Sequence, residues 1–469
     1  MKPANSPVAL PRSTLDATPL SPEPRRVLVR GVNWLGDAVM TLPALERLRE
    51  RFPRADITLL TPDKLADLWV EHPSVDEVMT FGAGEGVRSV ASRIRSWQAR
   101  KRAAKLGEEF RGVRRLLLAE MAGVALTQLA ALRGGGQQNA DLERARQRLE
   151  RQREVLAAYS ASPFDLALVL PNSARSALEV WLGRVPQRLG YTGRGRNWLL
   201  TRALAPRAGR VVMRQRSARE VRRLVSAPPG PAAPAGAHQI HEYLHLVAAL
   251  GGNPEPVAPR LEVKPAEVEG AVSRLKTELQ TTRTGAPAVV LEQEARAGSR
   301  PWFILAVNPG AEYGPAKRWP AASFAAAIRE VSARLGPCVW LAFGGAKDVA
   351  LCDEIAQAAG GGVVNLAGRT SLRELMALLK ICRVLLTNDS GPMHLAAALG
   401  TPVVAPFGST APELTGPGLP GDGRHCLLQV RPGCAPCFRR ACPIDLRCLT
   451  GIEPGRAAEA VAQRCVAGQ

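Results

Sequence analysis

The sequence of 469 residues predicts an α/β protein with two parallel-sheet domains of similar size. Two observations carry this prediction. Short apolar runs alternate with helical segments in two separate blocks, which is the pattern of βαβ units in a parallel sheet. In addition, the chain is too long for one core of ordinary size, while its 46% hydrophobic and 22% charged residues are typical of a globular protein.

The first block follows a Pro- and Ser-rich stretch, residues 1–25, which lacks the continuous apolar segment of a signal peptide and predicts a disordered tail. VLVRG predicts the first strand, and the helical pattern after it ends near Pro53. DITLLTP, EVMTF and DLALVLP predict three further strands. We therefore assign residues 26–215 to an N-terminal domain.

The alternation of strands and helices is interrupted between about residues 90 and 160. This segment predicts long helices with a glycine-rich break at Gly134–Gly136 and weak apolar periodicity after the break. We interpret it as a solvated helical insertion in the N-terminal domain. A basic patch for nucleic acid is the less favoured alternative, because dispersed charges usually mark a solvated face.

Residues 216–300 are interpreted as a linker and variable region. They contain the Pro- and Ala-rich SAPPGPAAPAGA, a predicted short helix over His241–Leu250 and a polar stretch before the second block. Five strands of a C-terminal domain, residues 301–469, are then predicted by FILAVNPG, CVWLAFGG, VVNLAG, VLLTND and PVVAPFG. Two such domains would face a cleft, which is where ligands usually bind.

The composition narrows the classes of partner. Lysine and arginine number 62 against 42 aspartate and glutamate residues, a formal net charge of +20. This charge favours nucleic acid, anionic membrane surfaces or phosphorylated substrates. Aromatic residues make up only 4%, so surfaces for stacking nucleic-acid bases are scarce. No apolar run is long enough to predict a membrane-spanning helix, and the expected compartment is the cytoplasm.

Four of the nine cysteines cluster in CAPCFRRACPIDLRC: Cys434, Cys437, Cys442 and Cys448. A C-x2-C pair followed by two more thiols is a possible zinc site. However, the second pair is widely spaced and the cluster contains no histidine. We favour interpretations without a metal, in which these residues are reduced structural thiols or a redox-labile clasp.

Two loops after predicted strands carry candidate chemistry. In GVNWLGDAVMTLP, Asp37 stands at the start of a helix, where capping or dipole complementarity and general-base catalysis are equally supported. Gly36 beside it leaves room for a substrate. In VNPGAEYGPAKRWP, glycines let the backbone approach a phosphate closely, and Lys317 supplies a positive charge.

A third loop lies in LLTNDSGPMHLAAALGTPVVAPFGST. Its strand ends at Asp389, after which Ser390 suits an N-cap and Pro392 a first helical turn. Free N–H groups at such a helix start can hold a diphosphate. His394, on the same helix, is either part of that phosphate site or a structural histidine bound to nearby backbone.

These three segments resemble the signature segments of the bacterial ADP-heptose:lipopolysaccharide heptosyltransferases of glycosyltransferase family 9, most closely the heptosyltransferase II group. PNSARSALEVWLGRVPQRLGY and CAPCFRRACP resemble the same family. The similarity covers nearly all of residues 27–454, apart from the insertion and the two polar linkers. Each segment alone is moderately specific, and the three together are highly specific.

The resemblance implies a GT-B architecture, in which two Rossmann-like domains face a cleft. It implies an inverting glycosyltransferase that moves L-glycero-D-manno-heptose from ADP-heptose to the heptose-Kdo2-lipid A inner core of lipopolysaccharide. The acceptor would bind mainly to the N-terminal domain and the sugar nucleotide mainly to the C-terminal one. The expected partners are ADP-heptose and a lipid-anchored, phosphorylated acceptor reached by peripheral contact with the cytoplasmic face of the inner membrane. No cofactor, metal or nucleic acid is expected.

Residue roles follow from the same resemblance. Asp37 matches the family's proposed base, and Lys317 matches the cation that holds the donor diphosphate, so these two are the expected catalytic residues. The implied donor-binding residues are Asn308, Gly310, Glu312, Lys317, Asp389, Ser390, Gly391 and His394. The implied acceptor-binding residues are Gly36, Asn172 and Ser173.

Two features depart from the family pattern. Inserted helices at about 90–160 are not usual in the family, and CPIDLRC lacks the histidines that many relatives place before the last cysteine. Two alternatives stay open. One is a related glycosyltransferase with another sugar nucleotide or acceptor, and the other is a non-catalytic basic binding protein on this scaffold. The second would be expected to lack Asp37 or Lys317, and the sequence has both.

Overall fold

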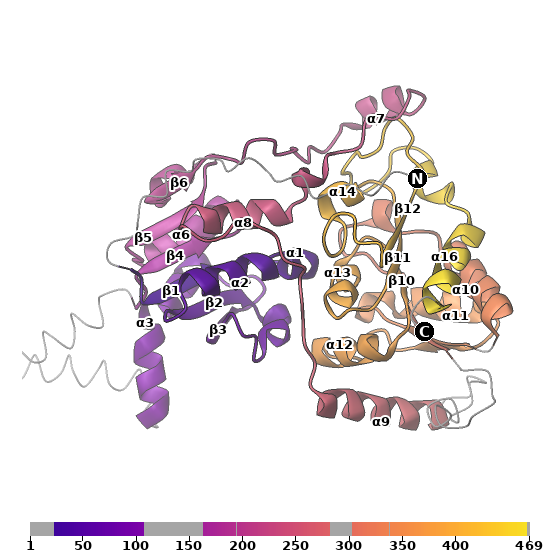
Figure 1. Cartoon of the computed structure of the whole chain (residues 1–469), viewed down its shortest axis with the longest axis horizontal. Coiled ribbons are helices and arrows are strands. Elements are labelled where there is room, and N and C mark those ends of the chain that lie inside the picture. The colour runs from indigo at the N-terminus through magenta and orange to yellow at the C-terminus, as the bar shows by residue number, and fades with distance from the viewer. Residues whose placement is uncertain (1–22, 107–162, 194, 282–302, 337, 467–469) are drawn as a thin grey trace, which may run out of the picture.

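The structure is a computed structural model that describes residues 23–106, 163–193, 195–281, 303–336 and 338–466. Two lobes lie side by side, each built around one sheet (Figure 1). The predicted tail, apart from its last three residues, lies outside the described part of the chain. No helix in the described ranges is long and apolar enough to cross a membrane.

The N-terminal lobe contains a six-stranded parallel sheet. Its strands are β1 (Arg26–Arg30), β2 (Asp56–Pro62), β3 (Glu77–Phe81), β4 (Leu166–Val169), β5 (Gln187–Tyr191) and β6 (Arg202–Leu204). They are ordered β3-β2-β1-β4-β5-β6, and every neighbouring pair is parallel. Its helices are α1 (Leu35–Met40), α2 (Leu42–Arg51), α3 (Val87–Leu106), α6 (Ala174–Leu182) and α8 (Ile240–Ala248), with η1 (Asp63–Trp69) and η2 (Asn197–Leu199) as short 3-10 turns.

The C-terminal lobe repeats this arrangement. Its strands are β7 (Phe303–Asn308), β8 (Cys338–Ala342), β9 (Val363–Asn365), β10 (Leu385–Thr387), β11 (Val403–Phe407) and β12 (Cys426–Gln429), ordered β12-β11-β10-β7-β8-β9 and all parallel. Its helices are α9 (Pro265–Thr281), α10 (Ala321–Leu335), α11 (Val349–Ala359), α12 (Leu372–Ile381), α13 (Gly391–Ala398), α14 (Pro412–Thr415), α15 (Arg447–Thr450) and α16 (Pro454–Val466). Short turns are η6 (Pro315–Lys317) and η7 (Ala346–Asp348).

Helices cover both faces of each sheet. In the N-terminal lobe, α2 and α8 belong to one buried apolar cluster with β1, whereas α3 and α6 belong to another on the opposite face. The strands alternate accordingly: Val27 and Val29 face the first cluster, and Leu28 faces the second. The first cluster continues through α1 and α13 into the C-terminal lobe, so the two lobes share buried apolar surface.

Each sheet has a point at which the strand order reverses, between β1 and β4 and between β7 and β10. This is the Rossmann order, and ligands of such sheets bind beyond the carboxyl ends of the strands at this point. The predicted α/β class with two Rossmann-like domains is confirmed. The predicted strands are confirmed as well, but β5, β6 and β12 were not anticipated because these strands are short and carry no continuous apolar run of strand length.

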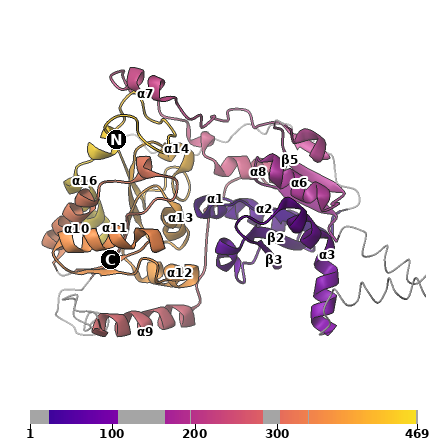
Figure 2. The same cartoon turned by 180° about the vertical axis from the view of Figure 1, so that it is seen from behind.

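Where the chain is described, residues 216–300, interpreted as a linker and variable region, contribute helices to both lobes. The helix expected at His241–Leu250 is confirmed as α8, and it packs on α2 of the N-terminal lobe. Helix α9 packs on α12 of the C-terminal lobe, beside which it lies in Figures 1 and 2. The chain therefore crosses between the lobes three times before β7 begins: to α7 (Ala218–Leu224) on the C-terminal lobe, back to α8, and across again to α9.

Of the predicted insertion, the structure describes only α3, which begins at Val87. Its first turns are part of the lobe, because Val90 and Ile94 are fully buried against α6. The glycine-rich break and the second predicted helix lie outside the described residues.

Candidate active site

A cleft of about 1050 Å³ lies between the lobes, at the carboxyl ends of β1, β7, β8 and β10. It is lined by all of the expected catalytic and donor-binding residues and by one of the three expected acceptor-binding residues: Gly36, Asp37, Asn308, Gly310, Glu312, Lys317, Asp389, Ser390, Gly391 and His394. The fold thus brings together three loops that are far apart in the sequence. Their roles remain predictions.

Asn172 and Ser173 are not among the residues that line the cleft. They follow β4, and Ser173 is the N-cap of α6, where its Oγ accepts a hydrogen bond from the Ser176 amide at 3.2 Å. Their predicted contact with an acceptor stays a prediction.

Lys317 and Asp389 form an ion pair at the floor of the cleft. The Lys317 Nζ lies 2.7 Å from the Asp389 Oδ2, and the two side chains are 15% and 4% exposed. The hydroxyl of Thr410 donates a second hydrogen bond to the same carboxylate oxygen at 2.5 Å. The pair is therefore largely desolvated, which strengthens its electrostatic interaction with any charged ligand.

The loops that carry this ion pair are fixed by a buried asparagine. The Asn388 side chain accepts a hydrogen bond from the Trp319 amide at 2.9 Å and donates one to the Pro309 carbonyl at 2.6 Å. In addition, the Thr387 hydroxyl donates to the Asn308 carbonyl at 3.0 Å. These bonds join the loops after β7 and β10, so the lysine and the carboxylate are held in place before a ligand binds.

Asp37 enters the cleft from the opposite lobe. It does not cap α1, since the N-cap of that helix is Trp34. Its carboxylate accepts a hydrogen bond of 3.2 Å from the Gln239 amide, which also donates to the Tyr243 hydroxyl at 2.8 Å. Desolvation in the cleft raises the pKa of Asp37 to about 6, although Lys317 and the hydrogen bond from Gln239 act in the opposite direction. Such a pKa suits a base that works near neutral pH.

Two glycines allow the lobes to meet beside Asp37. A Cβ on Gly36 would lie 2.8 Å from the Cδ2 of His394, and a Cβ on Gly391 would lie 2.8 Å from the Cβ of Leu35. Any larger side chain would therefore push α1 away from α13. His394 itself is 5% exposed, and burial lowers its pKa to about 4, so the imidazole is neutral at physiological pH.

Helix α13 presents its start to the cleft. Ser390 is the N-cap, as predicted, but its side chain forms no capping hydrogen bond, and Pro392 lies in the first turn. The Ser390 side chain thus satisfies none of the backbone N–H groups of this turn, although the Met393 N–H donates to the Ser390 carbonyl at 3.2 Å. Together with the helix dipole these N–H groups favour an anion at this place.

The loop that carries Lys317 lies next to a second cation, Arg440. Tyr313 donates a hydrogen bond to the Phe438 carbonyl at 2.7 Å, and its ring lies 5.1 Å from the Lys317 Nζ and 5.3 Å from the Arg440 guanidinium. Gly314 has a φ of 148°, and a Cβ there would lie 2.6 Å from the Arg440 carbonyl oxygen. The cysteine-containing segment therefore forms part of the cleft wall.

Glu312 occupies the rim of the cleft. It pairs with Lys64 of the opposite lobe, at 3.0 Å between Nζ and Oε1, and both side chains are more than half exposed. An exposed ion pair of this kind contributes about 0–1 kcal/mol. It can therefore open at little cost if a ligand enters between the lobes.

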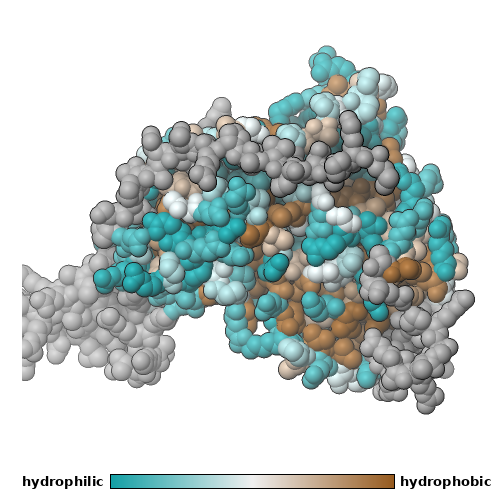
Figure 3. All heavy atoms as spheres, viewed as in Figure 1, coloured by the Kyte–Doolittle hydropathy of each residue, from teal (hydrophilic) through white to brown (hydrophobic). Residues whose placement is uncertain are grey.

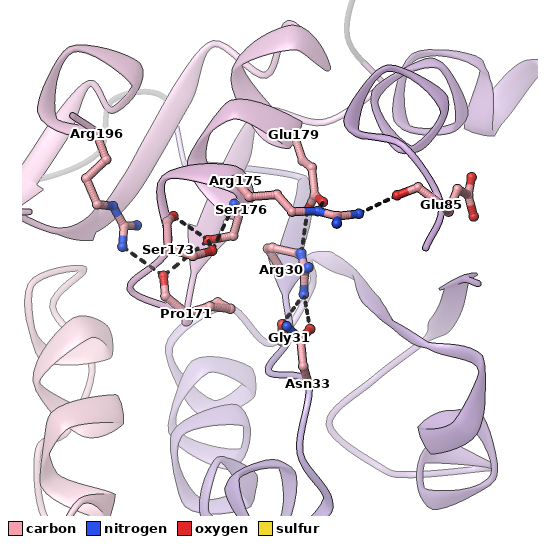
Figure 4. Close-up of polar contacts among 10 residues, drawn as sticks. All are labelled: Arg30, Gly31, Asn33, Glu85, Pro171, Ser173, Arg175, Ser176, Glu179 and Arg196. Atoms are coloured by element: carbon pink, nitrogen blue, oxygen red, sulfur yellow. Dashed lines mark hydrogen bonds and ion pairs between the residues drawn. The ribbon is translucent and has the colours of Figure 1, made fainter. Parts of the chain in front are cut away.

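A buried polar network holds the loop that leads to Asp37 (Figure 4). Arg30, at the end of β1, donates to the Glu179 Oε2 at 2.7 Å, and the two side chains are 2% and 0% exposed. Arg30 also donates to the Gly31 carbonyl and, at 3.2 Å, to the Asn33 side chain. The remaining oxygen of Glu179 accepts from Arg175 at 3.0 Å. Strand β1, helix α6 and the β1–α1 loop are thereby joined.

We expect Glu179→Gln to lower the free energy of unfolding by about 3 kcal/mol, because it leaves the Arg30 guanidinium buried without a charged partner. Urea unfolding of the variant and parent measures the difference. The matched control is Glu330→Gln, whose exposed pair with Arg334 spans 3.7 Å and should contribute less than about 1 kcal/mol. A loss for Glu179→Gln no larger than for the control would contradict the prediction.

Several residues around the site were not predicted. Gln239 and Tyr243 lie in the region interpreted as a linker, and no local pattern links them to Asp37, which is about 200 residues earlier. Thr410 ends the third motif segment, so its proximity to Asp389 had a sequence signal that was not used. Met213 and Gln215 also line the cleft from the crossing segment between the lobes.

The four clustered cysteines are free thiols. Cys434 and Cys437 pack against Val221 of α7 in a small apolar cluster. Burial raises the pKa of both thiols, and it raises the pKa of Cys448 to about 12. Within the described part of the chain, no group of three or more histidine, cysteine or acidic residues has an arrangement that could hold a metal ion.

Comparison with known proteins identifies relatives along most of the chain. Residues 213–447 match the model of Glycosyltransferase family 9 (heptosyltransferase). Lipooligosaccharide heptosyltransferase 2 of Haemophilus influenzae is 26% identical over 395 residues, which cover 83% of this chain and 85% of the relative. Lipopolysaccharide heptosyltransferase 2 of Salmonella typhimurium is 27% identical over 397 residues, 84% of this chain and 85% of the relative.

The fold has a counterpart among solved structures. The structure of ADP-heptose lps heptosyltransferase II from E. coli superposes with a TM-score of 0.59 at 22% sequence identity, covering 94% of this chain and 99% of the other. With the two facing Rossmann sheets described above, this similarity confirms the predicted GT-B architecture.

Proposed function

The chain belongs to glycosyltransferase family 9 and is a glycosyltransferase, and we propose that it moves heptose from ADP-heptose to the inner core of lipopolysaccharide with inversion at the anomeric carbon. Relatives that span most of the chain are named heptosyltransferase 2. The single observation that carries the proposal is geometric. One lobe supplies Asp37 and the other supplies the pair of Lys317 and Asp389, and all three line the same cleft.

The C-terminal lobe would bind the donor. The start of α13 offers backbone N–H groups and Lys317 offers a positive charge, which are the two features that bind a diphosphate. On donor binding, Lys317 would turn from Asp389 toward the diphosphate, and Asp389 would accept hydrogen bonds from the heptose hydroxyls. Leu372 and Leu375 form an apolar part of the wall against which the adenine could rest.

Asp348 is a candidate partner for the ribose. It follows β8, lines the cleft and accepts a hydrogen bond from the Gly345 amide at 3.0 Å. In Rossmann sheets, an acidic residue after the second strand binds a ribose hydroxyl, and β8 is the second strand of this sheet.

The reaction would proceed by in-line displacement. An acceptor hydroxyl oxygen attacks the anomeric carbon of the heptose, and its proton passes to the carboxylate of Asp37. The bond between that carbon and the diphosphate oxygen breaks, and its electron pair leaves with ADP. Lys317 and the start of α13 would stabilise the negative charge that develops on the leaving group through an oxocarbenium-like transition state.

The acceptor would approach from the N-terminal lobe. Gly36 is in the cleft beside Asp37, whereas Asn172 and Ser173 lie at the carboxyl end of β4, next to β1 in the sheet. An acceptor that reaches Asp37 and extends along this edge of the sheet would contact both places. Because such an acceptor is lipid-anchored, we infer that the enzyme works in the cytoplasm at the surface of the inner membrane.

The proposal is tested by incubating the protein with ADP-heptose and defined acceptors, heptose-Kdo2-lipid A and the same core without heptose, and measuring products by mass. We expect addition of one heptose to the first acceptor. ADP-glucose and UDP-glucose serve as donor controls. Product from another donor but none from ADP-heptose would overturn the proposed donor and favour a related glycosyltransferase.

The pH profile provides a second check. Because the pKa of Asp37 is raised to about 6, the base becomes protonated as the pH falls through this value, well above the range of an ordinary aspartate. We expect kcat/KM to decline about tenfold per pH unit below about pH 6. The measurement uses an acceptor without phosphate monoesters, since these titrate in the same range. A profile that stays flat down to about pH 4 would contradict the raised pKa.

A further inference from the structure

An arginine-rich segment crosses from one lobe to the other at the edge of the cleft. This arginine arm, residues 205–224, contains seven arginines and one glutamate, for a formal net charge of +6. It starts after β6 and ends with α7, which Figure 1 shows at the extreme top of the molecule. Two of its residues, Met213 and Gln215, line the cleft, so the arm forms part of the cleft mouth.

Both ends of the arm are anchored. At the N-terminal lobe, Arg207 and Arg210 pair with Glu242 of α8, at 3.3 and 3.5 Å. At the C-terminal lobe, the Arg216 amide donates to the Cys437 carbonyl at 2.9 Å, and the Arg216 guanidinium donates to the Gly433 carbonyl at 3.0 Å. The arm is thus a fixed structure that bridges the lobes.

Helix α7 turns its charged face outward. Val221 is 1% exposed and packs with Cys434 and Cys437, whereas the arginines of the helix, Arg219, Arg222 and Arg223, are exposed. A capping box formed by Ser217 and Glu220 fixes the start of the helix. In Figure 3 the top of the molecule, where Figure 1 places α7, is mostly hydrophilic.

Apolar side chains stand next to these charges. Val212 is 72% exposed and Met213 is 39% exposed, although both are hydrophobic. Clustered arginines beside exposed apolar side chains suit the interface of an anionic bilayer, where the charges meet headgroups and the apolar groups enter the acyl boundary. The phosphates of a nucleic acid would account for the arginines but not for the exposed apolar pair, and a single-stranded site would also use aromatic stacking surfaces.

We propose that the arginine arm docks on an anionic lipid bilayer and so turns the mouth of the cleft toward the membrane. The inference rests on the proposed function, because it explains how a lipid-anchored acceptor reaches Asp37. Each exposed arginine contributes roughly 1 kcal/mol of attraction to such a surface. The loss of three arginines should therefore weaken binding by about 100-fold.

The experiment is co-sedimentation of the full chain with phosphatidylcholine vesicles that contain or lack phosphatidylglycerol. We expect the parent to bind only the anionic vesicles and to be released by salt. The triple variant Arg219→Gln, Arg222→Gln, Arg223→Gln should lose about 100-fold in partition, and Val212→Ser roughly tenfold. The charge-matched control variant is Arg54→Gln, Arg88→Gln, Arg456→Gln. These three arginines are exposed and lie outside the arginine arm, so the control variant should bind vesicles as the parent does.

Three results would overturn the proposal: equal partition of the triple variant and the parent, an equal loss in the control variant, or equal binding of the parent to neutral vesicles. Duplex DNA binding that the triple variant loses, without vesicle binding by the parent, would assign the arm to a polyanion instead.

The activity of the triple variant separates this inference from the proposed function. Its arginines do not line the cleft, so transfer to a soluble, delipidated acceptor should stay at the parental rate, while transfer to acceptor embedded in anionic vesicles falls. If the parent transfers no heptose to any acceptor, the proposed function fails. The vesicle-binding measurement still decides the role of the arm in that case.

Discussion

Asp37→Asn is expected to lower kcat/KM for transfer by about 100- to 10,000-fold, because it removes the proposed proton acceptor and keeps the shape of the side chain. The hydrogen bond from Gln239 can persist, since the asparagine oxygen accepts it as the carboxylate does. ADP affinity, measured by calorimetry, should stay within a few-fold, because a base that faces the acceptor contributes little to donor binding.

The same substitution should make the protein more stable at neutral pH. The pKa of Asp37 is raised to about 6 in the folded state from 3.8, so the folded chain holds this proton more tightly than the unfolded chain. The stability contributed by the group is therefore present at acidic pH and is lost as the pH rises toward 6 and above. Removal of the carboxylate should raise the free energy of unfolding by about 1–3 kcal/mol at neutral pH.

Asp63→Asn is the matched control for Asp37, because Asp63 is an exposed aspartate on the same lobe that does not line the cleft. It should leave the rate of transfer unchanged and should change the free energy of unfolding by no more than about 0.5 kcal/mol. Parental activity in Asp37→Asn would remove this residue from the mechanism. A fall in activity together with a large loss of stability would indicate a structural role instead of the base.

Lys317→Ala is expected to weaken ADP binding and to slow transfer by about 100- to 1,000-fold, because it removes the cation proposed to stabilise the charge that develops on the leaving diphosphate. The substitution also leaves Asp389, which is 4% exposed, without its ionic partner at 2.7 Å. The loss of its partner should lower the free energy of unfolding by about 3 kcal/mol, because the buried carboxylate is then unpaired. Activity and stability must therefore be measured on the same preparation.

A double variant separates the two effects. Lys317→Met combined with Asp389→Asn removes both charges, so it should recover most of the lost stability but not transfer. Lys64→Ala serves as a cation control from the rim of the cleft, since its pair with Glu312 is exposed and should change activity only a few-fold. Unchanged ADP affinity and transfer in Lys317→Ala would exclude this lysine from donor binding.

Local patterns predicted the strands better than the packing of the helices. Apolar runs located the long strands because a strand buried on both faces needs a continuous hydrophobic segment, as in β7 and β11. Strands β5, β6 and β12 escaped prediction because their sequences, QRLGY, RAL and CLLQ, contain no continuous apolar run of strand length. Helix α8 was predicted, but its place in the N-terminal lobe was not, since a helix pattern does not state against which sheet its apolar face packs.

By itself, the sequence determined that glycine-containing loops with one carboxylate and one lysine follow buried strands, since these features are encoded within a few residues of one another. Only the tertiary structure decided which of these groups meet and in what electrostatic surroundings. The raised pKa of Asp37, its bond to Gln239 and the pairing of Lys317 with Asp389 join residues that are 72 or more positions apart. Electrostatic interaction and desolvation depend on distance in space, which the order of residues along the chain does not specify.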